Sequence, residues 1–403
     1  MIKILEPKII SVDKKHSRLS CDILVDNQVR NIWFEVEKEY EQYLCYERAD
    51  AFLIGLLSWA MRLNHDIECV TPVNEELLYN IRSYLIPSLT KYGKKLYNIK
   101  IIAPTTNDIL PSAGSIGTGC SCGIDSFHAI LSNINSQYSN CRLTHVCLNN
   151  VGSFGSNDTT FSNTSEDGLY ESRIEKARKI ADDLGLKVII TNSNFADIFI
   201  QNHLLTNTYS SIFSVYVLQK LWKTYFYASA GLDFSGFNLK NNDLKDSSYN
   251  DLLLLNCFSN RNLRIYSEGG ALTRLEKTNE IADYKIVQNN IHVCNSINNC
   301  GKCKKCIRTM NTLYALGKLD LFANTFDIEY YKKHKDYYLG NLYLLHIQKD
   351  KMTAPEYEIL KKEITLSIKI KYLAVGLFKL IRKCIRIITN NTKFHYDLTK
   401  EFK

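Results

Sequence analysis

The sequence predicts an α/β protein built on a doubly wound parallel sheet, with an amino-terminal α+β domain and a helical carboxy-terminal segment. Between residues 111 and 325, strand-like and helix-like segments alternate, which is typical of a parallel sheet covered by helices on both faces. Residues 1–110 instead read as a hairpin followed by helices, and residues 326–403 are rich in Tyr and Lys with helical spacing. We therefore expect domains over residues 1–110 and 111–325, followed by a basic helical segment over 326–403.

In the amino-terminal domain we expect a hairpin over residues 19–37, with its turn at 26–28. A buried helix over 48–63 follows, then an amphipathic helix over 74–93 that Gly93 ends, and a strand over 98–104. In the alternating region, strands are expected over 143–151, 187–192, 224–229 and 262–267. The helices between them are expected over 170–185, 210–222 and 274–284, with a polar loop over 238–251.

Length and composition are those of a globular protein. The chain has 403 residues, of which 45 % are hydrophobic and 23 % are charged. Its amino terminus lacks the apolar core of a signal peptide, and no run approaches the roughly 18 apolar residues of a membrane span. We expect a cytoplasmic protein without a membrane span, in which the 13 cysteines do not form a disulfide scaffold.

The net charge of +8 is concentrated near the carboxy terminus. Residues 351–403 contain 12 Lys and Arg against 5 Asp and Glu, so the first 350 residues are nearly neutral, which argues against a basic catalytic groove. Four basic residues share one face of a predicted helix: Lys379, Arg382, Lys383 and Arg386. Five apolar residues share another face: Leu377, Ile381, Cys384, Ile385 and Ile388. We expect this helix to pack on the body with its basic side in solvent; contact with a membrane surface or with nucleic acid is the alternative.

A loop of small residues is the first candidate site. Residues 112–123 are mostly small and run into a helix that begins near Asp125. Gly119 and Gly123 permit a close approach of phosphate to the backbone, and hydroxyls with free N–H groups at a helix start form an anion-binding nest. No Gly-Lys-Ser/Thr follows, so the loop is not a Walker A motif. A tight turn without a ligand is the alternative.

The stretch Ser121-Cys122-Gly123-Ile124-Asp125-Ser126 resembles the S-G-G-x-D-S loop of the PP-loop ATP pyrophosphatases. The resemblance implies an adenine nucleotide α-hydrolase-like fold in which the loop holds the pyrophosphate end of ATP. It further implies that a substrate oxygen attacks the α-phosphate, that pyrophosphate leaves, and that a nucleophile then displaces AMP. Cys122 stands where the family usually has glycine.

A cluster of cysteines is the second candidate site. Cys294, Cys300, Cys303 and Cys306 follow the pattern C-x5-C-x2-C-x2-C, and Gly301 lets the chain turn between them. Four thiolates at this spacing can hold one tetrahedral ion, and zinc is the favoured metal over an iron–sulfur cluster or unrelated buried thiols. Because all four ligands are cysteines, the ion is expected to be structural.

Together the loop and the cysteine cluster resemble 7-cyano-7-deazaguanine synthases and a larger set of PP-loop proteins related to them, over about residues 112–320. The resemblance implies that ATP activates the carboxylate of a deazapurine, which ammonia converts to the amide and then to the nitrile. The first gap between the cysteines is shorter here, and residues 1–110 and the basic segment are not part of the compact synthase. The acceptor is therefore left open: a small molecule or a modified base, with ammonia or an amine as donor.

Roles follow for the remaining candidates. Asp125 is expected to position Mg²⁺ or only to cap the helix, and Asn149 and Asn150 to contact adenine and ribose or only to form a turn. Arg274 or Lys277 is expected to neutralise charge on the α-phosphate; the alternative for Lys277 is a solvated helix face. The residues assigned to ATP are Ser121, Cys122, Gly123, Ile124, Asp125, Ser126, Asn149 and Asn150. The expected cofactors are ATP, Mg²⁺ and Zn²⁺.

Three functions are therefore weighed. The favoured one is an ATP-dependent, AMP- and pyrophosphate-forming ligase that joins ammonia or an amine to a carboxylate or amide carbon. A sulfur-transferring enzyme acting on tRNA would use Cys120 or Cys122 as a reactive thiol, whereas we expect these cysteines only to fit a crowded turn. A nucleotide-binding scaffold would carry a degenerate loop and bind a protein partner through residues 1–110. The oligomeric state is left open.

Overall fold

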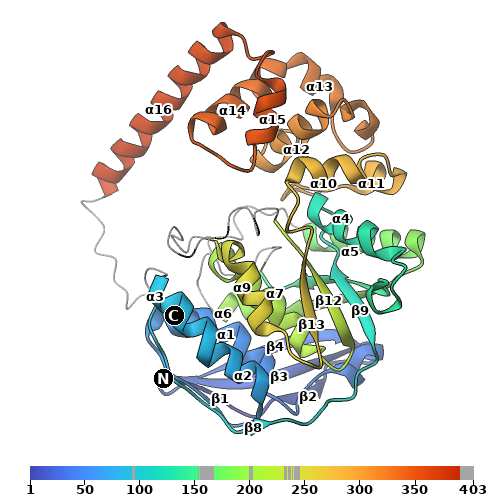
Figure 1. The fold of residues 1–403 in the computed structure, drawn as a ribbon, viewed down its shortest axis with the longest axis vertical. Coiled ribbons are helices and arrows are strands. Elements are labelled where there is room, and N and C mark those ends of the chain that lie inside the picture. The colour runs from blue at the N-terminus through green and yellow to red at the C-terminus, as the bar shows by residue number, and fades with distance from the viewer. Residues whose placement is uncertain are drawn as a thin grey trace. The chain divides into compact units, whose positions relative to one another are not determined.

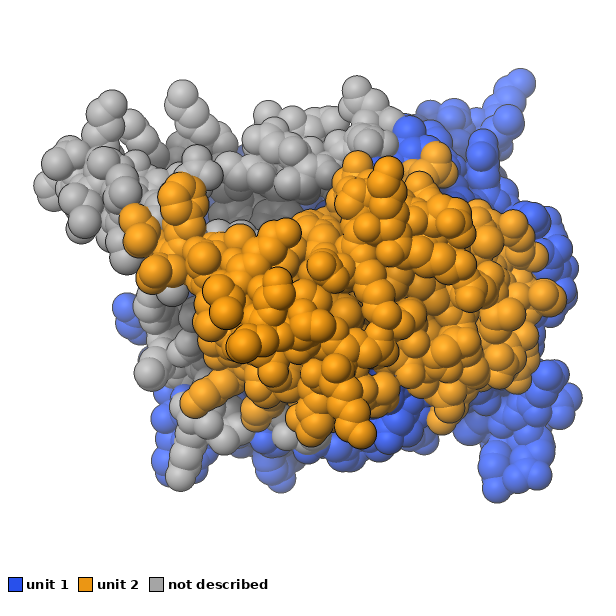
Figure 2. Space-filling model, turned by 90° about the horizontal axis from the view of Figure 1, so that it is seen from above, with its two compact units in different colours: residues 1–277, 295–297 blue, residues 278–294, 298–403 orange. Residues whose placement is uncertain are grey.

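A computed structural model of the chain describes residues 1–92, 96–152, 154, 168–198, 203–230, 234, 237, 239 and 246–390, with only the backbone of residues 203, 379, 380 and 382–390. Its contacts group the chain into two compact units, coloured separately in Figure 2. The larger unit comprises Met1–Lys277 with Asn295–Ile297, and the smaller comprises Thr278–Cys294 with Asn298–Lys403. The domains predicted over residues 1–110 and 111–325 divide the chain at different positions from these two units. That division stays a prediction.

The larger unit is mixed α/β with a large, mostly parallel central sheet, which confirms the predicted fold class at that level (Figure 1). Among the described residues the sheet has eleven strands, and its main path runs β13-β12-β9-β10-β11-β4-β3-β1-β5-β7. From β13 to β11, each adjacent pair of strands is parallel. Counted along the chain, these five strands have the order 3-2-1-4-5, which is that of doubly wound sheets.

The central parallel strand is made mostly of small residues. β9 (Ser115–Gly119) has the sequence SIGTG and lies between β10 (His145–Asn150) and β12 (Trp222–Ala228). The indole of Trp222 lies against Gly117, where an added Cβ would come within 2.6 Å of the ring. A tertiary contact therefore requires glycine at residue 117, and a strand with two glycines, a serine and a threonine lacks the hydrophobic pattern from which the other strands were predicted.

The amino-terminal hairpin is joined to the parallel strands. β3 (His16–Val25) and β4 (Gln28–Glu37) pair antiparallel over ten residues each, which confirms the hairpin and its turn. β4 then pairs antiparallel with β11 (Lys187–Ser193), with Val36 opposite Thr191. Short strands complete the other edge: β1 (Ile2–Ile4), β2 (Lys8–Ser11), β5 (Ile67–Cys69) and β7 (Ile101–Ile102). Residues 1–110 thus extend the same sheet.

Helices cover both faces of this sheet. α4 (Ile124–Ile134) contacts β9 and β12, and α5 (Leu169–Leu184) contacts β10 and β11. α1 (Asp50–Leu63), α7 (His203–Val217) and α9 (Asp251–Phe258) belong to the core on the opposite face. That core contains Cys147, Ile189 and Tyr225, whose neighbours along each strand point the other way.

Several predicted boundaries shift. The helix expected over 210–222 is α7, which ends at Val217 because Trp222 already pairs with β9. The segment 74–93 forms α2 (Glu75–Asn80), a π-helical stretch (Ile81–Leu85) and α3 (Ile86–Tyr92); Gly93 lies outside the described residues. The last strand of the sheet is β13 (Arg264–Glu268), and α10 (Arg274–Ile281) follows it. Most of the expected polar loop over 238–251 also lies outside the described residues.

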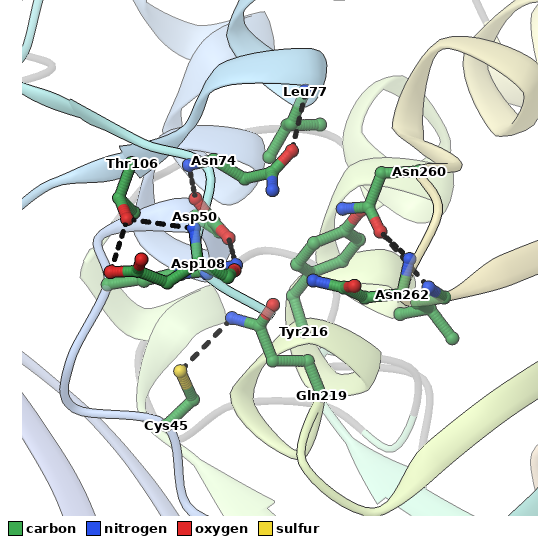
Figure 3. Close-up of polar contacts among 12 residues, drawn as sticks. Cys45, Asp50, Asn74, Leu77, Thr106, Asp108, Tyr216, Gln219, Asn260 and Asn262 are labelled. Atoms are coloured by element: carbon green, nitrogen blue, oxygen red, sulfur yellow. Dashed lines mark hydrogen bonds and ion pairs between the residues drawn. The ribbon is translucent and has the colours of Figure 1, made fainter. Parts of the chain in front are cut away.

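A buried polar cluster in the larger unit links the start of α1 to the start of α2 and to the segment around Asp108 (Figure 3). Asp50 is fully buried and accepts a hydrogen bond of 2.8 Å from the backbone N–H of Asn74, whose own side chain caps α2. The guanidinium of Arg48 lies 4.0 Å from the Asp50 carboxylate and donates to the carbonyl of Asp108. Burial raises the pKa of Asp50 to about 6.

The smaller unit is helical, as the sequence predicts for its carboxy-terminal part. It contains α11 (Lys285–Asn290), α12 (Lys304–Ala315), α13 (Ile328–Lys333), α14 (Lys335–Ile347), α15 (Ala354–Leu360) and α16 (Leu366–Asn390). None of the described helices is both long enough and apolar enough to cross a bilayer.

The last helix packs through a different face from the one expected. Ile368 and Tyr372 are buried against α14, whereas Leu377 and Ile381 are 60 % and 48 % exposed. The expectation that the apolar face with Leu377 and Ile381 packs on the body is therefore wrong for these two residues. The other residues of that face and the basic side chains have no described side chains: Lys379, Arg382, Lys383, Cys384, Ile385, Arg386 and Ile388.

Candidate functional site

The small-residue loop lies where parallel sheets bind ligands. β9 ends at Gly119 and α4 begins at Ile124, so residues 120–123 form the turn at the carboxyl end of the central strand. The chain leaves β9 toward β10 on one side, whereas β12 lies on the other, which makes β9 the point where the strand order reverses.

Hydrogen bonds within the larger unit fix the path of this loop. The hydroxyl of Ser126 donates to the carbonyl of Gly119 at 3.0 Å and accepts from the N–H of Ser121 at 3.1 Å. Arg173, on α5, donates to the carbonyl of Ser121 at 2.6 Å. Ser126 and Ile124 are buried, so their contribution to a ligand would come from the backbone, whereas Ser121 is exposed and Asp125 is partly so.

Cys122 has the backbone conformation of a glycine. Its φ is 61°, in the left-handed region, and its side chain is fully buried beside Cys120. A hydrogen bond from the Cys120 thiol lowers the pKa of Cys122, as do the charges of Arg173 and Lys176, and the same bond raises the pKa of Cys120. Burial of both thiols agrees with the expectation that they fit a crowded turn.

Three charged side chains meet at the first turn of α4. Arg274 Nη1 lies 2.8 Å from one Asp125 carboxylate oxygen, and Lys277 Nζ lies 3.5 Å from the other. Lys277 also donates to the carbonyl of Ser229 at 2.7 Å, at the end of β12. Residues from three neighbouring strand ends, β9, β12 and β13, therefore converge on one point.

The ammonium group of Lys277 is buried, which excludes the solvated-face alternative for this residue. Its side chain is 0 % exposed and that of Arg274 is 8 % exposed. Glu276 is exposed instead, and its carboxylate accepts hydrogen bonds from the N–H and hydroxyl of Thr273, which caps the helix start. Two buried cations therefore flank one carboxylate at the start of α4.

The sequence analysis did not identify His128 or Arg173 as residues near this point. His128 is buried one turn after Asp125, and Gly269 (φ +68°) brings it together with Lys277. A Cβ at residue 269 would lie 2.8 Å from Lys277 Cε and 3.0 Å from His128 Cε1. The three-residue spacing of Asp125 and His128 is the sequence signal for His128. Arg173 carries no such signal, because it reaches the loop from another helix.

Asn149 and Asn150 lie at the carboxyl end of β10, and their side chains bridge to β11. The Thr191 hydroxyl donates to Asn149 Oδ1 at 3.0 Å, and Asn150 donates to Asn192 Oδ1 at 3.0 Å. Both are partly exposed. Their assignment to adenine and ribose stays a prediction.

The cysteine cluster lies within the smaller unit and has the geometry of a metal site. The four sulfur atoms of Cys294, Cys300, Cys303 and Cys306 all lie within 4.8 Å of one another. The Sγ atoms of Cys294 and Cys303 are 3.7 Å apart, close to the roughly 3.8 Å expected between thiolates about 2.3 Å from one tetrahedral ion. The cluster could therefore hold a metal such as zinc.

Backbone donors support thiolates in this cluster. The N–H of Cys303 donates to Cys300 Sγ at 3.3 Å, and that of Cys306 donates to Cys303 Sγ at 3.5 Å. Hydrogen bonding from the Cys306 thiol lowers the pKa of Cys303 to about 4. Gly301, at φ +70°, makes the turn, and the Tyr338 hydroxyl donates to its carbonyl at 2.8 Å. These contacts hold the ligands in place from outside the cluster.

Comparison with protein-family models, with curated proteins and with solved structures finds no match to this chain.

Proposed function

We propose that this protein is an ATP-dependent ligase that forms AMP and pyrophosphate while joining ammonia or an amine to an acid or amide acceptor. The observation that carries the proposal is the convergence of Arg274 and Lys277 on Asp125, directly after the glycine- and serine-containing loop. This arrangement supports a phosphate site because the first turn of a helix and two buried cations all favour negative charge. The likeness of the loop to that of the PP-loop ATP pyrophosphatases supports the same assignment.

The proposed reaction has two steps. An acceptor oxygen attacks the α-phosphorus of ATP, the bond to the bridging oxygen breaks, and pyrophosphate leaves. Ammonia or an amine then attacks the activated carbon, forms the new C–N bond and releases AMP. In this proposal the backbone of residues 121–124 holds the leaving pyrophosphate, while Lys277 and Arg274 neutralise charge that develops in the transition state.

Asp125 and the cysteine cluster have separate roles in the proposal. The partly exposed carboxylate of Asp125 can accept Mg²⁺, whose charge would stabilise the leaving pyrophosphate. The four cysteines would hold a structural zinc ion, because no ligand position remains for water. Cys122 does not argue against turnover, since it already has the φ that glycine would adopt.

For the acceptor, the substrate that receives ammonia or an amine, we propose only a chemical class. The resemblance to 7-cyano-7-deazaguanine synthases favours a carboxylate on a small heterocycle or modified base. Candidate acceptors are therefore cellular acids and modified bases, supplied as fractionated metabolites together with ammonium.

The test measures AMP and pyrophosphate release by the full chain with ATP, Mg²⁺, ammonium and these fractions. We expect release in at least one fraction, and a loss of about 100-fold or more in Lys277→Met and Asp125→Asn, because each removes a charge from the transition-state site. Lys285→Met is the matched control: Lys285 is an exposed lysine on α11, and the same change there should leave the rate unchanged.

Nucleotide binding is measured on the same samples by calorimetry. ATP binding without AMP release in every fraction would contradict the ligase and favour the nucleotide-binding scaffold. Equal rates for Lys277→Met and the parent would contradict the assignment of the site, provided that both variants melt like the parent.

A further inference from the structure

The carboxy-terminal helix α16 is attached to the smaller unit by one face. Ile368 and Tyr372 are buried in a small core shared with α14 and α15. The ring of Tyr372 lies directly on Gly340, where an added Cβ would come within 2.2 Å of it, and Gly376 faces Leu344 in the same way at 2.9 Å. These close contacts at glycines hold α16 against α14.

A second face of α16 is apolar and exposed. Six large apolar side chains lie on it, each between 48 % and 72 % exposed: Leu366, Ile370, Leu373, Leu377, Phe378 and Ile381. The steps of four, three, four and four residues from 366 to 370, 373, 377 and 381 place five of them in one row along the helix. We call this row, with Phe378, the apolar stripe. Among the described residues, none buries it.

The charged side chains of the helix that carries the stripe are all basic. Residues 364–396 contain seven basic residues and no Asp or Glu. The basic residues are Lys369, Lys371, Lys379, Arg382, Lys383, Arg386 and Lys393. An apolar row on a helix with only basic charge is the composition of helices that lie in a membrane interface.

The combination of an apolar stripe with basic residues favours one kind of binding partner over others. Nucleic acid would satisfy the positive charge and leave the apolar stripe in water, whereas a second copy of the helix would cover the stripe and bring like charges together. The surface of an anionic bilayer supplies phosphate groups for the lysines and arginines and acyl chains for the stripe.

We propose that α16 binds peripherally to an anionic lipid bilayer, lying in the plane of the surface with the apolar stripe among the acyl chains. The rest of the smaller unit stays in water, because the face carrying Ile368 and Tyr372 remains packed on α14. The helix does not cross the bilayer in this arrangement.

The test is co-sedimentation of the full chain with vesicles of phosphatidylcholine alone and with phosphatidylglycerol added. We expect binding to the mixed vesicles that is roughly tenfold stronger than to the neutral ones and that weakens as salt is raised. The double variant Leu373→Gln with Leu377→Gln should weaken binding about tenfold or more. Both leucines would enter the acyl region of the bilayer, and glutamine side chains would not be stabilised there.

A matched pair controls for surface hydrophobicity. Leu321 and Ile359 are 43 % and 48 % exposed and lie outside α16, so Leu321→Gln with Ile359→Gln should bind as the parent does. Helix content and metal content measured on both double variants establish that they are folded.

Three results would overturn the proposal. The first is no binding to anionic vesicles, and the second is equal binding by the stripe variant and the parent. The third is a dimer in sedimentation velocity that Leu373→Gln with Leu377→Gln dissociates, which would assign the stripe to a second copy of the chain.

Discussion

Cys122 combines a left-handed backbone conformation with a fully buried side chain. A left-handed φ costs a residue with a side chain about 1–2 kcal/mol, and Cys122 has a φ of 61°. Its thiol is fully buried, so packing offsets part of this cost. Glycine and cysteine would suit this position for opposite reasons: glycine for its conformational freedom, cysteine for its small apolar side chain.

The two contributions predict how Cys122 responds to substitution. Cys122→Gly should change the free energy of unfolding by less than about 1 kcal/mol, because relieved strain and lost packing nearly cancel. Cys122→Val should destabilise the larger unit by about 2–4 kcal/mol, because a β-branched residue strongly disfavours positive φ. Thermal and denaturant unfolding of the three proteins measure this, and a valine variant as stable as the parent would contradict the assigned conformation.

Asp50 predicts a pH dependence of stability. Its pKa in the folded chain is about 6, against an ordinary value of 3.8 for an aspartate side chain. Between these values the folded state holds a proton that the unfolded state has lost, so this group makes stability fall as pH rises through that range. Above about pH 7 Asp50 is ionised in both states, and its effect on the free energy of unfolding no longer changes with pH.

Asp50→Asn removes this titration while keeping an acceptor for the N–H of Asn74. Relative to the parent, the variant should therefore gain roughly 1 kcal/mol in free energy of unfolding between pH 5 and pH 7.5. Denaturant titrations at both pH values measure the difference. Asp183→Asn, at an exposed carboxylate on α5, serves as the comparison, and identical pH slopes for Asp50→Asn and the parent would contradict the shift.

At the scale of elements, the cysteine cluster organises the segment before α12. Cys303 is the amino-terminal cap of that helix and accepts from the N–H of Cys306, so one sulfur would serve both the metal and the helix. Without a metal, four thiols that are held this close together lose the charge neutralisation that favours their thiolate forms.

Metal removal should therefore destabilise the smaller unit. The parent is expected to contain about one zinc ion per chain, and Cys303→Ser or a strong chelator should remove it and lower the melting temperature by several degrees. Cys141→Ser is the matched control, since Cys141 has the same intermediate burial and lies outside the cluster. Atomic absorption and thermal melts measure both effects, and unchanged zinc content in Cys303→Ser would contradict a four-cysteine site.

At the scale of the whole molecule, the continuity of the larger unit's sheet decides how the chain can be divided. β4 pairs with β11, and the core on that face draws side chains from both α1 and α7. A cut near residue 110 would expose the edge of β11 and a large part of that core. Exposed strand edges and apolar faces favour aggregation.

A fragment of residues 112–403 is accordingly expected to be insoluble when expressed alone. Co-expression with residues 1–111 should restore soluble protein, because the second fragment supplies β4 and α1. Solubility and size-exclusion profiles measure both outcomes. A soluble, cooperatively melting fragment 112–403 would instead support the separate amino-terminal domain that the sequence predicts.

The sequence by itself determined the features that depend on local spacing. Alternation of strands and helices indicated the α/β class, the hairpin over 19–37 followed from its polar turn, and the spacing of four cysteines predicted their cluster. The turn from β9 into α4 was located from its small residues. Each of these signals lies within one short stretch, where period and residue size restrict the conformation.

Only the tertiary structure decided which distant residues share a site. It placed Arg274 and Lys277 on Asp125, about 150 positions away, and brought Arg173 to the loop from another helix. It also made a central strand of SIGTG, because the ring of Trp222 requires Gly117 beneath it. These contacts join segments through space, and no local period in a single sequence records them.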